Sequence, residues 1–546
     1  MHPLSRTAIP TLLLCLAACG GSDAGGGTTP VSPTPPPVQP PVLGQTYTTS
    51  GRAAAGDVFV HLFEWRWADI ARECEVFLGP RGYKGIQISP PSEHAIIRNA
   101  SAFFPWWQRY QTVSYKLDQS RSGTEAELRD MVSRCRAVGV DIYADVVVNH
   151  MTAGSGTGSA GSIYTKYSYP SVPYTLINFH SACGIESYAV ASQVQNCELV
   201  GLADLATESE VVRERVARYL IALNELGIAG YRVDAAKHVP AGDLEAIMIR
   251  VNNAAAAAGR ARPYVFLEVI AGGGEAVTPQ QYYGVGFSTG GSTDITDFGY
   301  GNRMSDAFYG RNNRTLWTAI DQLTSGAIPS DKSVVFIDNH DTQRGDALFY
   351  ADSTYELAVE LMLAMPHGYP NVMSSIGFDR IAQGSRDSGP QSDASGVTRS
   401  VFNPDGSSRC SLGIGSTQVL EWICEHRRPA IANMVAFRKA TASAPVSNCG
   451  RGDWRIDNDP NRIAFCRDGA GFMAMSLSVT PITTPLPTRL PAGGYCNIAQ
   501  FTFTAASGQT PATCSGALVV VAGDGSATIA LSRRTAVALH SRAKVN

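Results

Sequence analysis

Short apolar runs alternate with longer amphipathic segments from Asp57 to beyond residue 430. This alternation is typical of repeated βα units around a parallel sheet. Between two such runs, Thr124 to Val138 is predicted to be a helix, because Thr124 and Glu127 can form a capping box at its start. Eight runs qualify as strands: Val58–Phe63, Gly85–Ser89, Val140–Asn149, Gly230–Asp234, Val265–Glu268, Asp294–Phe298, Val334–Asp338 and Asn371–Ser374. Eight such strands predict an α/β fold, a closed (β/α)8 barrel.

Two segments depart from this repeat. Residues 151–203 contain Gly/Ser-rich turns, several tyrosines and no convincing long helix, so we expect an irregular domain inserted after the third strand. From about Ser447 the pattern changes to short alternating runs, which predict a C-terminal antiparallel β-sandwich. These runs include Ile463–Cys466, Phe472–Leu477, Ala517–Val521 and Ala527–Leu531. The barrel is then expected over residues 51–150 and 204–440, and the C-terminal domain over 441–546.

The beginning of the chain carries an export signal. Arg6 precedes a short apolar stretch, Ala8 to Ala18, which is typical of a secretory signal peptide over residues 1–18. The run Leu16-Ala-Ala-Cys19 resembles a bacterial lipobox, in which the signal is cut before Cys19 and the thiol is acylated. The alternative is a simple secretory signal with a coincidental cysteine. Residues 19–50, rich in Gly, Thr and Pro, suit an extended tether. The protein is expected to be exported, as a cell-envelope lipoprotein or in secreted form.

Composition narrows the class of partner. The net charge of −3 argues against nucleic acid. After the N-terminus no apolar run reaches the 18 residues needed to span a bilayer, so membrane attachment is expected only through the lipid anchor. Ten cysteines remain when Cys15 and Cys19 are set aside. Their even number, without CxxC spacing, favours disulfides over a zinc site and leaves the pairing open.

Acidic side chains recur at the predicted C-terminal ends of four strands, the edge of a barrel where reactive groups lie. An isolated acid at a strand end is more often a helix cap or an arginine partner, but four such ends together favour a catalytic centre. The four segments are Asp145-Val-Val-Val-Asn149-His150, Gly230-Tyr-Arg232-Val-Asp234-Ala-Ala-Lys237-His238, Glu268-Val-Ile270 and Phe336-Ile-Asp338-Asn339-His340-Asp341.

In residue type, spacing and order these segments resemble the α-amylase family of glycoside hydrolases. Further runs are similar to its animal-type branch: His61-Leu-Phe-Glu-Trp-Arg-Trp, Gln87-Ile-Ser-Pro-Pro, Trp106-Trp107-Gln-Arg-Tyr110, Asp338-Asn-His-Asp-Thr-Gln-Arg344-Gly and Leu490-Pro-Ala-Gly-Gly-Tyr-Cys496. The resemblance extends from Asp57 to the C-terminus. It implies a monomeric, retaining enzyme that cleaves internal α-1,4-glucosidic bonds in starch, glycogen and malto-oligosaccharides.

The resemblance also implies catalytic roles. Asp234 matches the family's nucleophile, Glu268 its general acid, and Asp341 a third acid that grips sugar hydroxyls. Retention requires the attacking and protonating carboxyl groups to lie about 5–5.5 Å apart. Arg232 lies two residues before Asp234 on the same strand face, so we expect its charge to lower the pKa of Asp234. Burial and neighbouring acids are expected to raise the pKa of Glu268.

Sugar contacts follow from the same resemblance. Trp106, Trp107 and Tyr110 match aromatic platforms for the apolar faces of sugars, although a Trp-Trp pair is elsewhere more often core packing. The two histidines His150 and His340 match hydrogen-bond donors to one sugar. The remaining implied substrate contacts are Arg232, Lys237, His238 and Ile270, with Lys237 and Ile270 on the leaving-group side of the cleft.

A calcium ion is implied by Asn149 and Asp204, which match ligands of the family. Backbone carbonyls of Gln195 and His238 would complete the protein's share of the six to eight oxygens, and water would supply the rest. Such a site would join the inserted domain to the barrel rim as a scaffold. The alternative is that Asn149 and Asp204 only cap turns.

Chloride is not expected to bind. Chloride-activated members of the family hold the anion with an Arg, an Asn and a further Arg or Lys. Arg232 and Asn339 match the first two, but Asn371 stands at the third position and carries no charge. The glycine-rich loop of the family is also replaced by Asp346-Ala-Leu-Phe, which predicts a more open cleft.

The resemblance further implies four disulfides and leaves Cys449 and Cys466 to pair with each other. The four are Cys74–Cys135, Cys183–Cys197, Cys410–Cys424 and Cys496–Cys514. Two other functions remain open at this point: an exo-acting α-glucosidase or transglycosylase with the same four segments, and a carbohydrate-binding protein built on an inactive barrel. The presence of all three acids argues against the second.

Overall fold

The computed structural model describes residues 49–98, 104–282, 293–322, 328–411, 421–450, 453–507 and 510–545. The expected signal peptide, Cys19 and nearly all of the expected tether lie outside these residues. Across the described ranges, no helix combines the length and the apolar character that a membrane crossing requires.

Eight parallel strands form a closed barrel in the order β1-β14-β13-β12-β11-β10-β5-β2. They are β1 (Phe59–Leu62), β2 (Gly85–Ile88), β5 (Asp141–Val147), β10 (Gly230–Asp234), β11 (Tyr264–Leu267), β12 (Thr293–Thr296), β13 (Ser333–Val335) and β14 (Tyr369–Ser374). Each coincides with a predicted run, so the predicted barrel is confirmed.

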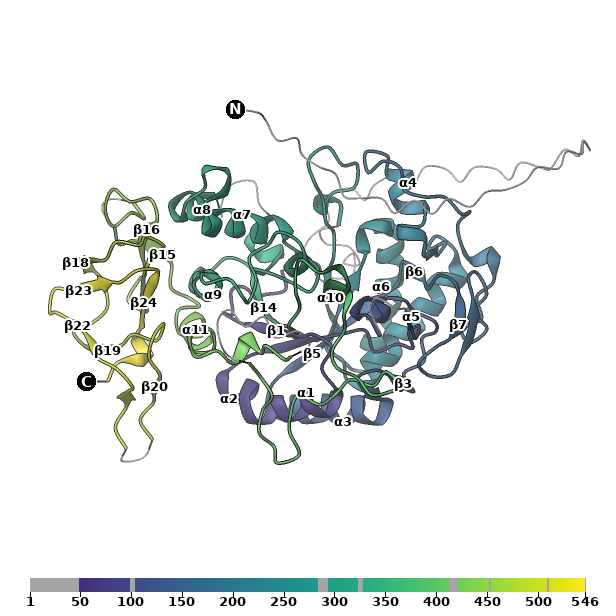
Figure 1. The fold of residues 1–546 in the computed structure, drawn as a ribbon, viewed down its shortest axis with the longest axis horizontal. Helices are drawn as coiled ribbons and strands as arrows, with labels where there is room; N and C mark the ends of the chain where they lie inside the picture. The colour runs from purple at the N-terminus through teal and green to yellow at the C-terminus, as the bar shows by residue number, and fades with distance from the viewer. Residues whose placement is uncertain are drawn as a thin grey trace, which may run out of the picture. The chain divides into compact units, whose positions relative to one another are not determined.

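Helices follow the barrel strands, and α5 and α6 lie side by side outside the sheet (Figure 1). The main ones are α1 (Trp67–Glu73), α3 (Glu125–Ala137), α5 (Glu210–Leu226), α6 (Ala241–Ala257), α7 (Phe298–Tyr309), α8 (Leu316–Gln322), α9 (Tyr355–Ala364) and α11 (Pro429–Ala440). Helix α3 begins with the predicted capping box, in which the Thr124 hydroxyl accepts from the Glu127 amide and the Glu127 carboxylate accepts from the Thr124 amide.

Side chains inside the barrel change character along each strand. Near the strand starts, an aromatic layer includes Tyr143, Tyr264 and Tyr369. Because side chains alternate between the two faces of a strand, the residue two positions later points to the same side. Asp145 and Asn371 follow two of these tyrosines in that way and are buried polar groups. The barrel interior therefore has an aromatic layer near the strand starts and buried polar groups toward the rim that carries the acids.

The segment between β5 and α5 is irregular, as predicted. Strand β6 (His150–Met151) pairs with β9 (Ala203–Asp204) in antiparallel fashion. Between them lie the hairpin β7 (Ser155–Thr157) with β8 (Ile163–Thr165) and one six-residue helix, α4 (Ala191–Asn196). The β6–β9 pair thus joins the two ends of the inserted segment beside the barrel rim.

The C-terminal region, yellow-green to yellow in Figure 1, is built from antiparallel strands, which confirms the predicted all-β domain. A four-stranded sheet contains β15 (Val446–Asn448), β16 (Arg462–Arg467), β17 (Gly471–Ser476) and β24 (Thr535–His540). Further pairs are β18 (Ile482–Pro487) with β23 (Ser526–Leu531), and β19 (Gly493–Cys496) with β22 (Leu518–Val521). Apolar side chains of these strands form a core of their own.

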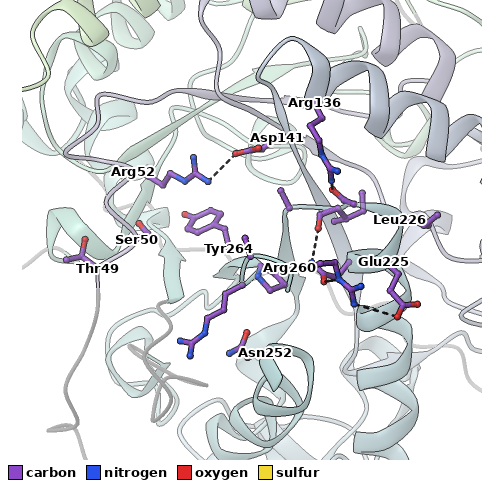
Figure 2. A pocket seen from close by; sticks show the side chains of 17 residues that line it. Thr49, Ser50, Arg52, Arg136, Asp141, Glu225, Leu226, Asn252, Arg260 and Tyr264 are labelled. Carbon is purple, nitrogen blue, oxygen red and sulfur yellow. Dashed lines mark hydrogen bonds and ion pairs between the residues drawn. The ribbon is translucent and has the colours of Figure 1, made fainter. Parts of the chain in front are cut away.

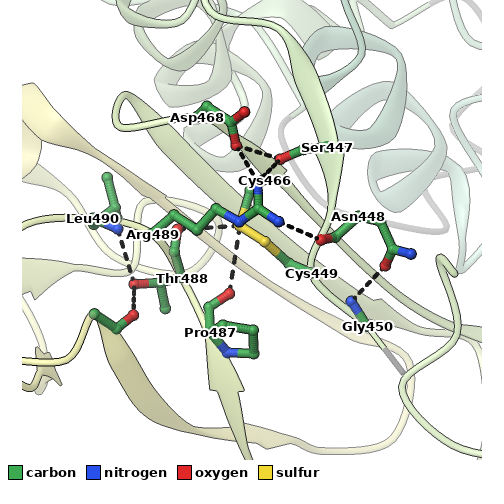
Figure 3. Close-up of a disulfide and its surroundings, with 11 residues drawn as sticks. Ser447, Asn448, Cys449, Gly450, Cys466, Asp468, Pro487, Thr488, Arg489 and Leu490 are labelled. Atoms are coloured by element: carbon green, nitrogen blue, oxygen red, sulfur yellow. Dashed lines mark hydrogen bonds and ion pairs between the residues drawn. A yellow bond between two sulfur atoms is a disulfide. The ribbon is translucent and has the colours of Figure 1, made fainter. Parts of the chain in front are cut away.

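Among the described residues the ten cysteines form five disulfides, and all five expected pairings are confirmed. Figure 3 shows the pair that had no counterpart in the family pattern, Cys449 with Cys466. Beside it, the Arg489 guanidinium donates to the Ser447 hydroxyl and to Asp468, both at 2.9 Å. The bond therefore fastens the segment after β15 to β16 within the C-terminal domain.

Candidate active site

Two carboxyl groups at neighbouring strand ends share one buried guanidinium. Arg232 Nη1 donates to Asp234 Oδ1 at 2.8 Å, and Arg232 Nη2 donates to Glu268 Oε1 at 2.5 Å. The other oxygen of Glu268 accepts from the Ala235 amide at 2.8 Å. Strand β10 supplies Arg232 and Asp234, and Glu268 directly follows β11. The structure thus brings together the two residues expected to be nucleophile and general acid.

Asp145 lies beneath this pair and is fully buried. It accepts from Arg232 Nη1 at 2.9 Å, from the Tyr110 hydroxyl at 3.1 Å and from Gln87 Nε2 at 3.2 Å. Sequence reasoning located Asp145 at a strand end but assigned it no role. The signal was available, since Asp145 faces Arg232 in the register of two adjacent parallel strands.

Burial dominates the acidity of these groups. It raises the pKa of Glu268 to about 7, with Asp234 and Asp341 adding to the rise, as expected. The expectation for Asp234 was wrong in its net direction. Arg232 does lower the pKa of Asp234, but loss of hydration outweighs that effect and raises it to about 7. Since the two carboxyl groups interact, they titrate as a pair, and near neutral pH they can share one proton.

Asp341 and His340 lie on the same rim, after β13. His340 Nε2 is 3.2 Å from Asp341 Oδ2, and the Asp341 side chain is 38% exposed. Desolvation raises the pKa of Asp341, while the charges of Arg232 and Arg344 oppose the rise. The His340 ring is stacked between Tyr110 and Phe63, with ring centroids 5.1 Å apart in each case. The imidazole is held in one plane, and burial keeps it neutral by lowering its pKa.

The expected aromatic platform lies on the 3-10 helix Trp106–Tyr110, after β2. Trp106 is half-buried and meets the edges of Tyr110 and His340 at centroid distances of 6.0 and 5.4 Å. Trp107 is half-buried beside it, whereas Tyr110 is buried. Trp106 and Tyr110 therefore belong to the same cluster as the catalytic candidates.

His150 is held by protein contacts at both ring nitrogens. Its Nε2 lies 3.0 Å from the Tyr110 carbonyl oxygen, and its Nδ1 accepts from Asn149 Nδ2 at 3.3 Å. Burial lowers the pKa of His150 to about 4, so the ring is neutral. For His150 Nε2 to donate a hydrogen bond to a sugar hydroxyl, it must give up its hydrogen bond to the Tyr110 carbonyl.

On the expected leaving-group side, Lys237 forms an ion pair with Glu275 and lies 4.5 Å from the centre of the Tyr188 ring. Ile270 is 44% exposed. Glu275 and Tyr188 were not foreseen, because they come from loops whose approach to Lys237 depends on the tertiary fold. Lys237 is thus already oriented, and Ile270 offers an exposed apolar contact.

The residues expected to bind calcium lie in two adjoining pairs. Asp204 stands opposite His150 in the β6–β9 register, and the Leu205 amide donates to the Asn149 carbonyl at 2.9 Å. Helix α4, which carries Gln195, contacts the 3-10 helix Ala236–His238, and the His238 ring lies 2.7 Å from the Val194 carbonyl. No group of three His, Cys, Asp or Glu side chains able to hold a metal occurs among the described residues. The expected ligand set contains only one such side chain.

The Asp204 carboxylate fits a cation. One of its oxygens accepts from His180 at 2.6 Å, whereas the other is buried and has no hydrogen-bond partner among the described residues. A buried carboxylate oxygen without a partner is costly, and a hard cation would satisfy it. His180 also lies 3.1 Å from Glu208. Burial alone would lower the pKa of His180, but Asp204 and Glu208 together raise it to about 9. His180 was missed because it lies outside the four motifs.

Asn371 takes part in a buried chain of amides. Its Nδ2 donates to Gln87 Oε1 at 3.0 Å, and Gln87 in turn donates to Asp145. Neutral side chains therefore link β14 to the acid beneath Arg232, at the position where the sequence analysis looked for a third anion ligand.

A separate pocket of about 680 Å³ lies at the opposite end of the barrel (Figure 2). It is lined by the starts of barrel strands, including Asp141 and Tyr264, and by Thr49 and Ser50. Arg52 in its wall donates to Asp141 at 3.2 Å. Because the candidate acids lie at the other ends of these strands, this pocket is not the candidate active site.

Fold and site together define a (β/α)8-barrel hydrolase with paired carboxyl groups at the rim, the arrangement that glycoside hydrolysis requires. Residues 89–257 match the model of the α-amylase catalytic domain, and residues 454–542 match that of the α-amylase C-terminal all-beta domain. The chain belongs to the α-amylase family and is a glycoside hydrolase.

Similar proteins cover nearly all of the chain. An α-amylase of Tribolium castaneum is 42% identical over 508 residues, covering 90% of this chain and 96% of that protein. Pancreatic alpha-amylase 2a5 of Mus musculus is 38% identical over 525 residues, covering 91% and 96%. The solved structure of α-amylase I from Eisenia fetida has a TM-score of 0.77 at 36% identity, covering 91% of this chain and 99% of that one. Animal enzymes are thus among its relatives, as the motifs implied.

Proposed function

We propose that this protein hydrolyses internal α-1,4-glucosidic bonds of starch and glycogen with retention at the anomeric carbon. The observation that carries the proposal is the pair Asp234 and Glu268 on the single guanidinium of Arg232. Asp234 attacks the anomeric carbon to form a glycosyl-enzyme, while Glu268 gives its proton to the leaving oxygen. Glu268 then takes a proton from water, which hydrolyses the intermediate. A mutant of the Eisenia fetida enzyme has been solved in complex with maltohexaose, which supports an extended glucan as substrate.

The test is the product pattern. Malto-oligosaccharides labelled at the reducing end should give labelled products of several lengths from the first time points, and nuclear magnetic resonance should show new reducing ends first as the α-anomer. Loss of one unit at a time from the non-reducing end would instead support the exo-acting alternative. New products that appear first as the β-anomer would contradict retention.

The sugar contacts proposed for this reaction are Asp341, Trp106, Trp107, Tyr110, His150, Arg232, Lys237, His238, Ile270 and His340. Contacts of His340 with the rings of Tyr110 and Trp106 support this set, because they link the platform to the rim acids. The proposed domain division follows the sequence: residues 51–150 and 204–440 for the barrel, 151–203 for the insertion and 441–546 for the C-terminal domain.

Calcium is the proposed structural ion, with Asn149, Asp204 and the carbonyls of Gln195 and His238 as ligands. The unpartnered oxygen of Asp204 supports this assignment. Bound calcium would neutralise Asp204 and join the insertion to the barrel rim. Chelation should lower the thermal midpoint of the wild-type protein and leave that of Asp204→Asn unchanged. An equal effect of chelator on both proteins would count against the site.

Activity is proposed to be independent of chloride. The amide of Asn371 and its bond to Gln87 support this, because neither residue supplies the positive charge that an anion requires. Replacing nitrate by chloride at constant ionic strength should change kcat less than twofold. A several-fold rise with chloride would contradict the proposal.

The chain is also proposed to be exported and anchored by acylated Cys19. The disulfides fit an oxidising compartment. Wild-type protein should partition into detergent and Cys19→Ser into water. Equal partitioning of both would contradict the anchor.

A further inference from the structure

Arg344 lies among three aromatic rings at the edge of the candidate active site. Its guanidinium carbon is 4.7 Å from the centre of the Trp106 ring, 4.6 Å from Phe378 and 5.5 Å from Phe63. These rings come from loops after β1, β2 and β14, while Arg344 itself follows β13. One cation thus contacts side chains from three other parts of the rim.

The hydrogen bonds of Arg344 point to the same neighbours. Nε donates to the Arg386 carbonyl at 2.8 Å, and that carbonyl also accepts from the Trp106 indole at 3.1 Å. Nη1 donates to the carbonyl of His340. The Trp106 ring is therefore held at its edge by the Arg386 carbonyl, which also binds Arg344, and at its face by the Arg344 guanidinium.

Burying the Arg344 guanidinium costs folding free energy, which suggests a role for it in orienting its neighbours. Arg344 is nearly inaccessible, and Nη2 has no partner among the described residues. A buried guanidinium with an unsatisfied N–H is destabilising by itself. The same charge opposes the rise in the pKa of Asp341 that desolvation causes. The position of Arg344 thus affects both the aromatic platform and the third acid.

We infer that Arg344 is a positioning residue that holds the Trp106 platform and His340 in the orientation that receives the sugar. This inference rests on the proposed amylase function and extends it to a residue outside the catalytic group. Guanidinium geometry matters here, because a planar group can stack on rings and donate in its plane at the same time, which an ammonium cannot do.

The test compares Arg344→Met, Arg344→Lys and a matched control, Arg380→Met. Arg380 stacks on Phe349 at 3.8 Å and donates to the Gln343 carbonyl at 2.8 Å, so it resembles Arg344 in the kind of contact it makes but binds other partners. Arg344→Met should lower kcat/KM by about 10²-fold, mainly through KM, because the platform is displaced. Arg380→Met should change it less than about threefold.

A double-mutant cycle with Trp106→Phe supplies a readout that general destabilisation would not move. The loss caused by Trp106→Phe in the wild type should shrink at least fivefold in the Arg344→Met background, because the ring is already misplaced there. If the two losses multiply independently, the inference is wrong. Should Arg344→Met not fold, the same cycle in Arg344→Lys decides the question with the same two outcomes.

The pH profile separates charge from geometry. The groups that affect Asp341 are Arg232, His340, Arg344, Asp234 and Glu268. Arg344→Met should move the acid limb of kcat/KM to higher pH, whereas Arg344→Lys should leave it in place while still losing the coupling to Trp106. An unchanged limb in Arg344→Met together with independent losses in the Trp106 cycle would overturn the inference. An inactive wild-type enzyme would instead refute the proposed function.

Discussion

Each end of the barrel interior holds an arginine among carboxyl groups, but the number of cations for each carboxyl group differs between the two ends. At the base, Arg52 pairs with Asp57 and Asp141, and Lys84 also pairs with Asp141. At the rim, Arg232 alone pairs with three carboxyl groups, and Asp341 stands nearby. At the base two ion-paired acids are matched by two cations, whereas at the rim three acids share one guanidinium.

This difference indicates where chemistry is possible. At the base, the ion-paired acids Asp57 and Asp141 are matched by Arg52 and Lys84, so these pairs stabilise the fold. At the rim, four buried or half-buried acids surround one guanidinium, and some of them must stay protonated. A shared proton beside an ionised carboxylate is what retaining hydrolysis uses.

The largest expected effect is the difference in kcat between a variant that lacks Arg232 at the rim and one that lacks Arg52 at the base. Arg232→Met should lower kcat at least about 10²–10³-fold, because both reacting carboxyl groups lose their common donor. Arg52→Met should change kcat less than twofold and lower the free energy of unfolding by about 1–2 kcal/mol, the sum expected for half-exposed ion pairs and ring contacts. Steady-state kinetics and urea unfolding would measure both. Comparable losses of kcat in the two variants would remove the contrast.

A smaller effect concerns two acids with similar pKa values at opposite ends. Burial raises the pKa of Glu268 and that of Asp294 to about 7 in each case. Activity should fall as pH rises through about 7, because Glu268 loses its proton. Asp294→Asn should leave this alkaline limb in place, since Asp294 accepts hydrogen bonds from Ser50 and Tyr264 at the base, away from the reacting groups.

Asp294 should instead affect stability. Its folded pKa is raised above the ordinary value of 3.8, so its contribution is fully present below that value and is lost as pH rises through about 7. The difference in thermal midpoint between wild type and Asp294→Asn should therefore shift against the wild type from pH 5 to pH 8. A pH-independent difference would show that Asp294 is not protonated in the folded state.

Elements with a local cause were predictable from the sequence. The barrel strands and the capping box at Thr124 follow from periodicity and spacing, whereas the pairing of Cys449 with Cys466 depended on the four disulfides that the family resemblance implied. The net pKa of Asp234 was not predictable, because it depends on how completely water is excluded. The contacts of Arg344 and of His180 were also not predictable, because their partners come from distant segments that meet only in the folded chain.

The smallest expected effect lies in the C-terminal domain. Replacing Cys449 and Cys466 together by Ala should lower the stability of this domain by about 3 kcal/mol, the value for closing a loop of this size, 17 residues. Removing Cys496 and Cys514, which are 18 residues apart, is a matched control and should cost a similar amount. Neither change should alter kcat, as measured on soluble starch below the unfolding transition. A loss of kcat in the folded variants would link this domain to the rim.

The central claim is that the carboxyl pair on Arg232 performs the chemistry, and Glu268→Gln tests it most directly. The amide keeps the shape of the side chain but cannot deliver a proton. Starch hydrolysis should fall by at least about 10³-fold, while calorimetry should still detect binding of maltohexaose. Activity within a few-fold of wild type, in a variant that binds maltohexaose normally, would contradict the account.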